Sequence, residues 1–303
     1  MQSVSDERLI VVEGPTAVGK SDIAVSLALA INGEIISADS RQIYKGLNIG
    51  TGKISQDEMR GIPHHLLDIE NPDKRFSVVE FQKQAETIIE SIISRNKVSI
   101  ICGGTGFYIE AITNGIVLPE VPANEVLRQS LLSLDEDTLM KKLHTLDPIR
   151  ASTIDSHNKR RVIRSIEIAT ALGKVPPIAP LSKYSNRQVL KIGLILPDEI
   201  LRDKINKRLL ARLQSGMIEE AENLHKNGLS FERMRELGLE YKFLADFLDG
   251  KLSKEDMISE LSTAIWHYAR RQKTWFRRDK EIKWFSPQDY NDIEKVVKEF
   301  LKN

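Results

Sequence analysis

Two hydrophobic patterns alternate along the N-terminal third of the chain. Short apolar runs, typical of buried strands, are separated by segments whose apolar residues recur at helical spacing. The strands are expected at residues 9–12, 34–37 and 98–102, and the helices at 23–31 and 79–94. The second helix follows a capping box, in which Ser77 precedes Glu80 by three residues. This alternation predicts an α/β fold with a parallel sheet and crossover helices.

The pattern changes after Pro119 and Pro122. Residues 123–157 are polar and helical with few strand signals, so 119–187 is predicted to be a mostly helical insertion between two parts of one core, 1–118 and 188–303. Within and after it we expect a helix at 160–172, a Pro-rich link at 176–180, a strand at 189–196 ended by Pro197, and helices at 200–214, 217–226, 240–249, 254–278 and 290–302.

A complete phosphate-binding P-loop of the form GxxxxGK[ST] lies between the first strand and the first helix. Its residues are Gly14, Pro15, Thr16, Ala17, Val18, Gly19, Lys20 and Ser21. Strand, loop and helix together aim backbone N–H groups and a helix N-terminus at a phosphate. Lys20 supplies a positive charge, and the Ser21 hydroxyl is placed to bind Mg²⁺. Such loops are commonly labelled ATP-binding, but they recognise phosphates rather than nucleosides, so the ligand stays open.

Composition adds limits rather than detail. The chain has 303 residues, which suits about two domains, and it is 41% hydrophobic and 29% charged. No apolar run approaches the roughly 20 residues that span a bilayer, and the N-terminus shows no signal sequence. The single cysteine, Cys102, lies in an apolar run, which favours a buried thiol over a reactive one. We therefore expect a cytoplasmic protein without membrane contact.

Two polar turns follow predicted strands, at the sheet edge where open α/β folds bind ligands. Asp39 follows the second strand and could accept a proton from a nucleophile; alternatively it caps a turn with Ser40. The turn 103–106, Gly-Gly-Thr-Gly, follows the third, where most P-loop hydrolases carry a carboxylate for Mg²⁺ and water. That difference argues against an ATPase or GTPase. It leaves Thr105 able to hydrogen-bond a substrate, unless the segment is only a glycine-rich turn.

Basic residues are clustered although the net charge is only +1, from 44 Lys and Arg against 43 Asp and Glu. One cluster is 159–161 with Arg164, and the other runs from 270 to 283. Arg270, Lys273 and Arg277 recur at helical spacing and are expected to share one face. A solvated basic face is one interpretation. Two basic helices in a near-neutral chain also fit contact with a polyanion such as nucleic acid.

His64 and His65 are adjacent on a predicted loop. Neighbouring histidines lack the usual spacing of metal ligands, and no carboxylate pair is close in sequence. We expect them to be structural or to shape a substrate site rather than to bind a metal.

Seven segments occur in an order that resembles one family. They are 14–21, 36–45 (Ile-Ser-Ala-Asp-Ser-Arg-Gln-Ile-Tyr-Lys), 49–53 (Ile-Gly-Thr-Gly-Lys), 62–68 (Ile-Pro-His-His-Leu-Leu-Asp), 103–109, 160–167 and 270–277. Over nearly its whole length the chain resembles the bacterial tRNA dimethylallyltransferases, the tRNA Δ2-isopentenylpyrophosphate transferase family. The P-loop alone is shared by many families, whereas the ordered set is specific.

The resemblance implies transfer of a dimethylallyl group from dimethylallyl diphosphate to N6 of adenosine 37, beside the anticodon of tRNAs that read codons starting with U. The P-loop and Arg208 would hold the diphosphate, with Mg²⁺ on Ser21. Asp39 would accept the N6 proton, and Thr105 would orient the amine. Matched tRNA contacts are Asp39, Ser40, Arg41, Gln42, Thr105, Arg128, Arg160, Arg161, Arg164, Arg270, Arg271, Lys273 and Arg277. We also expect a monomer that needs no obligate protein partner.

Two departures from the family pattern leave contacts open. The family's compact Gly-Tyr-Arg or Gly-Tyr-Lys reads Gly-Leu-Glu-Tyr-Lys at 238–242, and a family arginine in the insertion aligns with Leu127 or Arg128. Three rival functions also remain. A P-loop small-molecule kinase is disfavoured because 103–106 carries no carboxylate. A non-catalytic RNA-binding protein would leave the P-loop unexplained. An adenylate isopentenyltransferase would leave the basic helices unexplained.

Overall fold

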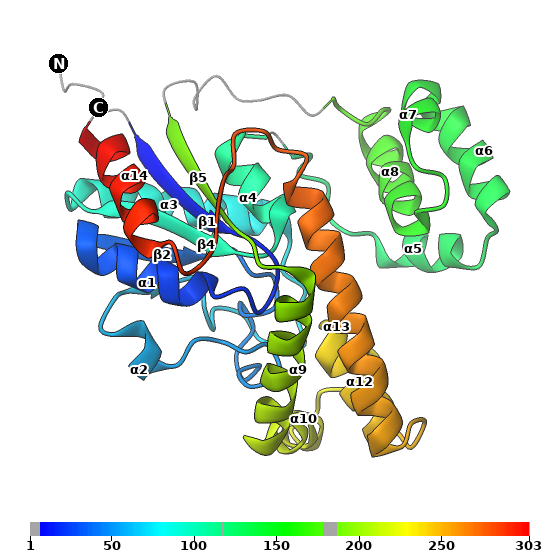
Figure 1. Cartoon of the computed structure of the whole chain (residues 1–303). Coiled ribbons are helices and arrows are strands. Elements are labelled where there is room, and N and C mark those ends of the chain that lie inside the picture. Colours follow the sequence, from blue (N-terminus) through cyan, green and yellow to red (C-terminus); the bar gives the residue numbers. More distant parts are fainter. Residues whose placement is uncertain (1–6, 117, 178–186, 303) are drawn as a thin grey trace. The chain divides into compact units, whose positions relative to one another are not determined.

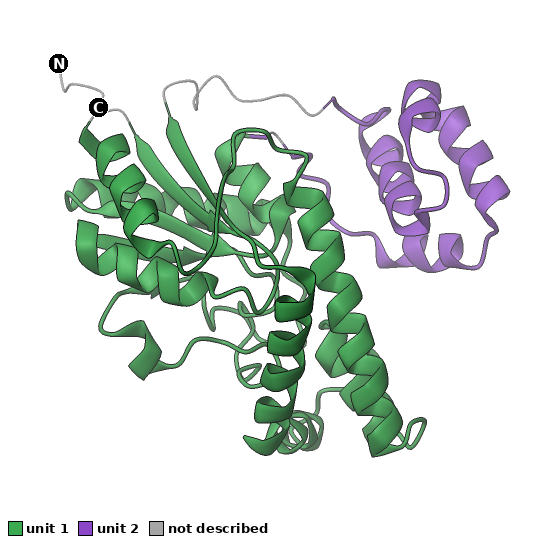
Figure 2. Ribbon diagram, in the orientation of Figure 1, with its two compact units in different colours: residues 1–115, 183–303 green, residues 116–182 purple. Residues whose placement is uncertain are grey.

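The computed structural model describes residues 7–116, 118–177 and 187–302. The chain forms two compact units, residues 1–115 with 183–303, and residues 116–182 (Figure 2). The sequence-based expectation set these boundaries at 118/119 and 187/188. Part of the expected Pro-rich link, 178–180, lies outside the described residues.

Unit 1 is built on an all-parallel sheet of six strands in the order β3-β2-β4-β1-β5-β6 (Figure 1). The strands are β1 (Arg8–Glu13), β2 (Gly33–Ser37), β3 (His64–His65), β4 (Val98–Gly103), β5 (Gln188–Leu194) and β6 (Lys283–Phe285). The central register aligns Val12 of β1 with Cys102 of β4 and Ile192 of β5. The predicted α/β class, with strands separated by helices, is confirmed.

Helices cover both faces of this sheet because the strands are apolar on both sides. Ile10 and Val12 face one buried cluster, and Leu9 and Val11 face the other. Figure 1 shows α1 and α14 on one face and α3 and α4 on the other. The helices of unit 1 are α1 (Lys20–Ile31), α2 (Gln56–Met59), α3 (Val78–Ser94), α4 (Gly106–Thr113), α9 (Asp198–Gln214), α10 (Met217–Lys226), α11 (Phe231–Glu236), α12 (Leu239–Leu248), α13 (Lys254–Phe276) and α14 (Tyr290–Lys302).

Unit 2 is helical and has its own small core. Its helices are α5 (Glu125–Leu132), α6 (Glu136–Leu146), α7 (Pro148–Thr153) and α8 (Lys159–Leu172). Each begins with a side-chain cap, from Asn124, Asp135, Asp147 and Asn158 respectively, which satisfies otherwise unpaired N–H groups. Leu139 and Leu143 of α6 pack with Val162 and Ile166 of α8.

Several short elements were not predicted. They are α2, β3, α4, α11 and β6, of eight residues or fewer. Segments this short carry too few positions to show a period. The strand expected at 189–196 ends at Leu194, where its pairing with β6 ends, and the helix expected at 254–278 ends at Phe276. The capping box of Ser77 and Glu80 is confirmed at the start of α3.

Candidate active site

The P-loop connects β1 to α1, as its sequence predicted. α1 begins at Lys20, so its N-terminal amides and the positive end of its dipole face the loop. The Lys20 ammonium donates to the Pro15 carbonyl at 2.8 Å. Burial lowers the pKa of Lys20 to about 8, and the Asp39 carboxylate is among the charges that oppose this shift. The lysine is thus held inside the loop, and it loses its proton at a lower pH than an exposed lysine does.

A cavity of about 860 Å³ opens beside the P-loop. Its lining includes Ala17, Gly19, Lys20 and Ser21 of the loop, the segment 52–56, and Lys204, Arg208 and Arg212 of α9. The Arg208 guanidinium is exposed and donates to the Gly52 carbonyl at 2.8 Å. P-loop amides, one lysine and several basic side chains of α9 therefore surround one cavity, an arrangement that suits a small polyphosphate.

The loop 48–50, at the rim of this cavity, is fixed by one carboxylate that the sequence analysis missed. Glu220 of α10 accepts from the amides of Asn48, Ile49 and Gly50 at 2.8–2.9 Å. It also accepts from the Tyr241 hydroxyl at 2.6 Å. The signal was present, because Glu220 lies three residues after buried Met217 and just before buried Ala221 on the inner side of α10. Tyr241, whose contact the sequence left open, is fully buried.

The residues on either side of Asp39 bind Thr105 because β2 and β4 are neighbours. The Thr105 amide donates to the Ala38 carbonyl at 3.1 Å, and the Thr105 hydroxyl accepts from the Ser40 amide at 3.1 Å. The Asp39 carboxylate accepts from the Arg41 amide at 2.9 Å through Oδ1. Asp39 is therefore a turn residue, and the same turn holds it beside Thr105.

These two candidate residues are not among those that line the cavity. The Gln42 side chain connects the two regions by donating to the Gly52 carbonyl at 3.4 Å. The site thus has two neighbouring parts. One is a basic cavity at the P-loop, and the other is the Asp39–Thr105 turn.

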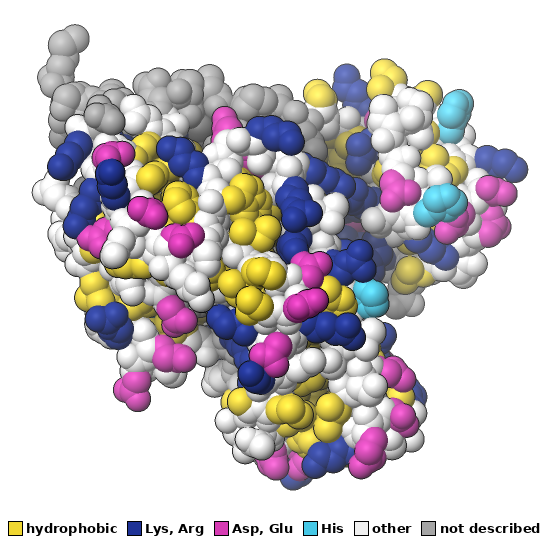
Figure 3. Space-filling view, viewed as in Figure 1, with side chains coloured by type: hydrophobic (Ala, Val, Ile, Leu, Met, Phe, Trp, Pro, Cys, Tyr) yellow, Lys and Arg dark blue, Asp and Glu magenta, His cyan; other side chains and the backbone are white. Residues whose placement is uncertain are grey.

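The basic residues of α13 and its C-cap do not all lie on the surface. Arg270, Arg271 and Arg277 are exposed, and Figure 3 shows Lys and Arg side chains gathered along this part of unit 1. Lys273 is only 8% exposed and forms an ion pair with Asp198 at the start of α9. Burial and this ion pair argue against Lys273 as a tRNA contact, because its ammonium group already interacts with Asp198.

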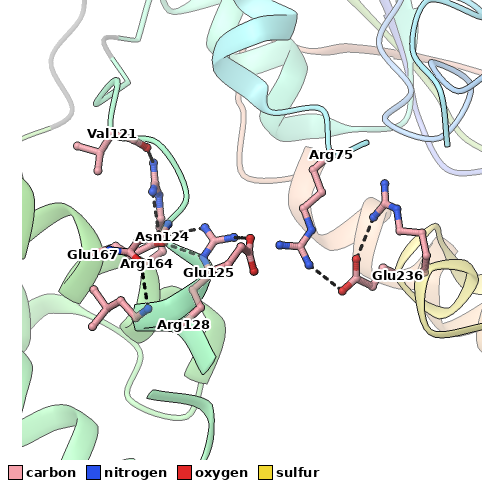
Figure 4. A network of polar contacts seen from close by, with 10 residues as sticks. Arg75, Val121, Asn124, Glu125, Arg128, Arg164, Glu167 and Glu236 are labelled. Carbon is pink, nitrogen blue, oxygen red and sulfur yellow. Dashed lines mark hydrogen bonds and ion pairs between the residues drawn. The ribbon is translucent and has the colours of Figure 1, made fainter. Parts of the chain in front are cut away.

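The arginines of unit 2 likewise divide into those that bind a buried carboxylate and those that are exposed (Figure 4). Glu167 is 2% exposed and accepts from Arg128 and Arg164, each at 2.9 Å, and from the Asn124 amide at 2.7 Å. Burial works to raise the pKa of Glu167, but these hydrogen bonds hold it below its usual value. Arg128 and Arg164 therefore organise the fold around a buried carboxylate, whereas Arg160 and Arg161 are exposed.

Other candidates are structural. Cys102 is buried, as predicted, and burial raises the pKa of its thiol to about 12, which disfavours the reactive thiolate. His65 hydrogen-bonds Glu34 at 2.7 Å, and His64 contacts the Ile62 carbonyl at 2.9 Å. Within the described ranges, no group of three or more His, Cys, Asp or Glu side chains could hold a metal ion. Nor does any helix there have the length and apolar character needed to cross a membrane.

Comparisons with known proteins agree with this geometry. Residues 42–279 match the model of the IPP transferase family. The chain is 42% identical to a tRNA dimethylallyltransferase of Anoxybacillus flavithermus, over 97% of this chain and 95% of that one. It also resembles the crystal structure of a tRNA isopentenylpyrophosphate transferase of Bacillus halodurans, with a TM-score of 0.74, 35% identity and coverage of 98% and 97%.

A eukaryotic dimethylallyltransferase, solved in the course of acting on tRNA, matches with a TM-score of 0.74 and 30% identity. That match covers 89% of this chain and 70% of the other. The sequence and structural matches thus extend over nearly the whole chain. This chain belongs to the IPP transferase family.

Proposed function

We propose that this protein transfers a dimethylallyl group from dimethylallyl diphosphate to N6 of adenosine 37 in tRNAs that read codons starting with U. The products are N6-(dimethylallyl)adenosine and diphosphate. The observation that carries the proposal is a basic P-loop cavity next to a carboxylate turn, in a chain of the IPP transferase family. Each part has a role in one displacement reaction.

The cavity binds the leaving group in this proposal. The loop amides, Lys20 and Arg208 interact with the diphosphate oxygens. Ser21, which is exposed at the start of α1 and lines the cavity, fits a Mg²⁺ ion that takes most of its ligands from phosphate and water. When bound, that ion would offset negative charge on the departing diphosphate.

The Asp39–Thr105 turn serves the acceptor. N6 of the adenine forms a bond to the allylic C1 while the C1–O bond breaks and its electron pair leaves with the diphosphate. The proton lost from N6 passes to the Asp39 carboxylate, and Thr105 orients the amine. A base in an anticodon loop has to leave its stack to reach such a site, so adenosine 37 is expected to flip out.

The tRNA itself is bound by exposed basic side chains. The exposed arginines available for phosphates are Arg160 and Arg161 of α8, Arg270 and Arg271 of α13, and Arg277 at the C-cap of α13. Arg41 and Gln42 lie in the Asp39 turn. We place the reaction in the cytoplasm, where unmodified tRNA is found, and propose a monomer.

The test is incubation with unmodified tRNA and labelled dimethylallyl diphosphate, followed by mass spectrometry of the nucleosides. Prenylated adenosine at position 37 is expected. A reaction that labels free adenine nucleotides but not tRNA would move the function to the adenylate isopentenyltransferases. Absence of any prenylated product would refute the proposal.

A further inference from the structure

A glutamine interrupts the buried face of α13. The residues that this helix buries include Leu261, Ile265, Ala269 and Phe276, and Gln272 lies in the same stripe at 7% exposure. A buried amide is costly unless its carbonyl and its NH₂ group both find hydrogen-bond partners. Apart from Gln272 and the ion-paired Lys273, the residues that α13 buries are apolar, so a buried glutamine here indicates a specific role.

Gln272 meets that requirement by joining two loops. Its Oε1 accepts from the Thr16 amide at 2.9 Å, and its Nε2 donates to the Gly104 carbonyl at 2.8 Å. The two partners fix which end of the side chain is oxygen and which is nitrogen, because an N–H must meet an acceptor and a C=O must meet a donor. Thr16 belongs to the P-loop after β1, and Gly104 to the turn after the neighbouring strand β4.

Two glycines of the 103–106 turn, Gly104 and Gly106, make room for side chains of α13. A Cβ atom on Gly104 would lie 2.4 Å from Gln272 Nε2, and a Cβ atom on Gly106 would lie 2.3 Å from Trp275 Nε1. Gln272 and Trp275 are one helical turn apart on α13. Gly104 and Gly106, on either side of Thr105, therefore leave room for α13 to pack directly against the turn, whereas a Cβ atom on Gly103 would meet the Ala38 backbone.

We propose that Gln272 is a positioning residue that sets the separation between the P-loop and the Thr105 turn. This inference rests on the proposed function, in which the P-loop holds the leaving group and the turn orients the acceptor. Gln272 touches neither substrate and acts through Thr16 and Gly104. A displacement of about 1 Å between reacting groups can cost on the order of 10²-fold in rate.

The position of Gln272 on α13 adds a consequence. The same helix presents Arg270 and Arg271 just before Gln272, and Arg277 is its C-cap. A helix that carries the proposed tRNA contacts thus also supplies the link between the two halves of the reaction site. Docking of tRNA along α13 would act on the segment that Gln272 fixes.

The first test is Gln272→Met, which keeps the length and approximate volume of the side chain but removes both hydrogen bonds. We expect kcat for tRNA prenylation to fall on the order of 10²-fold. The dissociation constant of dimethylallyl diphosphate, measured by calorimetry without tRNA, should change less than a few-fold. An unchanged kcat would overturn the proposal. So would a loss of diphosphate affinity as large as the loss of kcat, because Gln272 would then act in binding.

The second test is Gln272→Glu, which keeps the proposal testable if the methionine variant does not fold. A protonated carboxyl can donate to the Gly104 carbonyl and accept from the Thr16 amide, whereas the carboxylate cannot donate. The ratio of variant to wild-type kcat should therefore rise as the pH is lowered from 8 to 6. A ratio that does not change with pH would overturn the proposal.

Gln84 of α3 is exposed and provides matched controls for both substitutions. Gln84→Met and Gln84→Glu should leave kcat and its pH profile unchanged. The wild-type protein separates the two hypotheses. A wild-type enzyme that does not prenylate tRNA refutes the proposed function, while active wild type with unaffected Gln272 variants refutes only the positioning role.

Discussion

Asp39 combines two roles that the sequence presented as alternatives. Its Oδ1 accepts from the Arg41 amide, so it does cap a turn. That turn is bound to the next one through the hydrogen bond from the Ser40 amide to Thr105. A carboxylate fixed in this way loses little rotamer freedom when it accepts a proton, which favours its use as a base.

Substitution of Asp39 by Asn should separate chemistry from binding. The amide keeps the shape of the turn and can still accept from the Arg41 N–H, but it is not a base at neutral pH. We expect prenyl transfer to slow by about 10²- to 10⁴-fold with tRNA affinity nearly unchanged. Single-turnover kinetics and tRNA binding measure the two quantities. Near-wild-type turnover would show that Asp39 serves the turn alone.

Lys20 should make diphosphate binding pH-dependent. Its pKa is lowered to about 8 by burial, so in the free protein it loses its proton as the pH rises through 8. A diphosphate favours the charged form, and binding above pH 8 then requires uptake of a proton. Affinity for dimethylallyl diphosphate without tRNA should fall by up to about tenfold per pH unit between pH 8 and 10.

Lys20→Ala is the control for that titration. It should bind dimethylallyl diphosphate weakly at pH 7, show a flatter pH dependence and lose prenyl transfer, because the leaving group loses a main cation. Calorimetry at several pH values gives both curves. Equal pH profiles for wild type and variant would rule out Lys20 as the titrating group.

At the scale of helices, burial separates the basic residues into two classes. Arg277, the C-cap of α13, and Arg160 of α8 are exposed. Lys273, in the same sequence cluster as Arg277, is buried against Asp198. Helical spacing predicted one shared face for Arg270, Lys273 and Arg277, but Lys273 is buried whereas Arg270 and Arg277 are exposed. Spacing could not show that α9 comes close enough for Lys273 to pair with it.

Salt dependence of tRNA binding distinguishes these classes. Removal of one phosphate contact, by Arg160→Ala or Arg277→Ala, should reduce the slope of log K against log salt by roughly 0.7 to 0.9. Lys273→Ala should instead lower the melting temperature and leave the slope nearly unchanged. Filter binding at salt concentrations between about 50 and 300 mM measures this slope. A reduced slope for Lys273→Ala would show that its ion pair opens to tRNA.

At the scale of the whole molecule, the loops that follow β1 and β4 favour diphosphate chemistry over ATP hydrolysis. β1 leads into the P-loop, and its neighbour β4 leads into a glycine-rich turn against which α13 packs. The position that many P-loop hydrolases give to a water-organising carboxylate is here taken up by helix packing. The two loops that define the site are joined to each other through Gln272.

We therefore expect no tRNA-stimulated hydrolysis of ATP. Inorganic diphosphate should be released in equal amount with prenylated adenosine. Parallel assays of orthophosphate, diphosphate and modified nucleoside measure this stoichiometry. A robust, tRNA-dependent release of orthophosphate from ATP would instead favour a kinase or NTPase.

The sequence by itself determined the features that depend on neighbouring residues. The P-loop, the alternation of strands and helices, the Ser77 capping box and the burial of Cys102 are properties of short segments, so periodicity and local motifs predict them. The tertiary structure decided which polar groups meet. Glu220 reaches a loop 170 or more residues away, and Gln272 joins loops 256 and 168 residues away. Such pairings depend on how strands and helices pack, and therefore only the folded chain shows which charges are buried as supports and which remain exposed for a ligand.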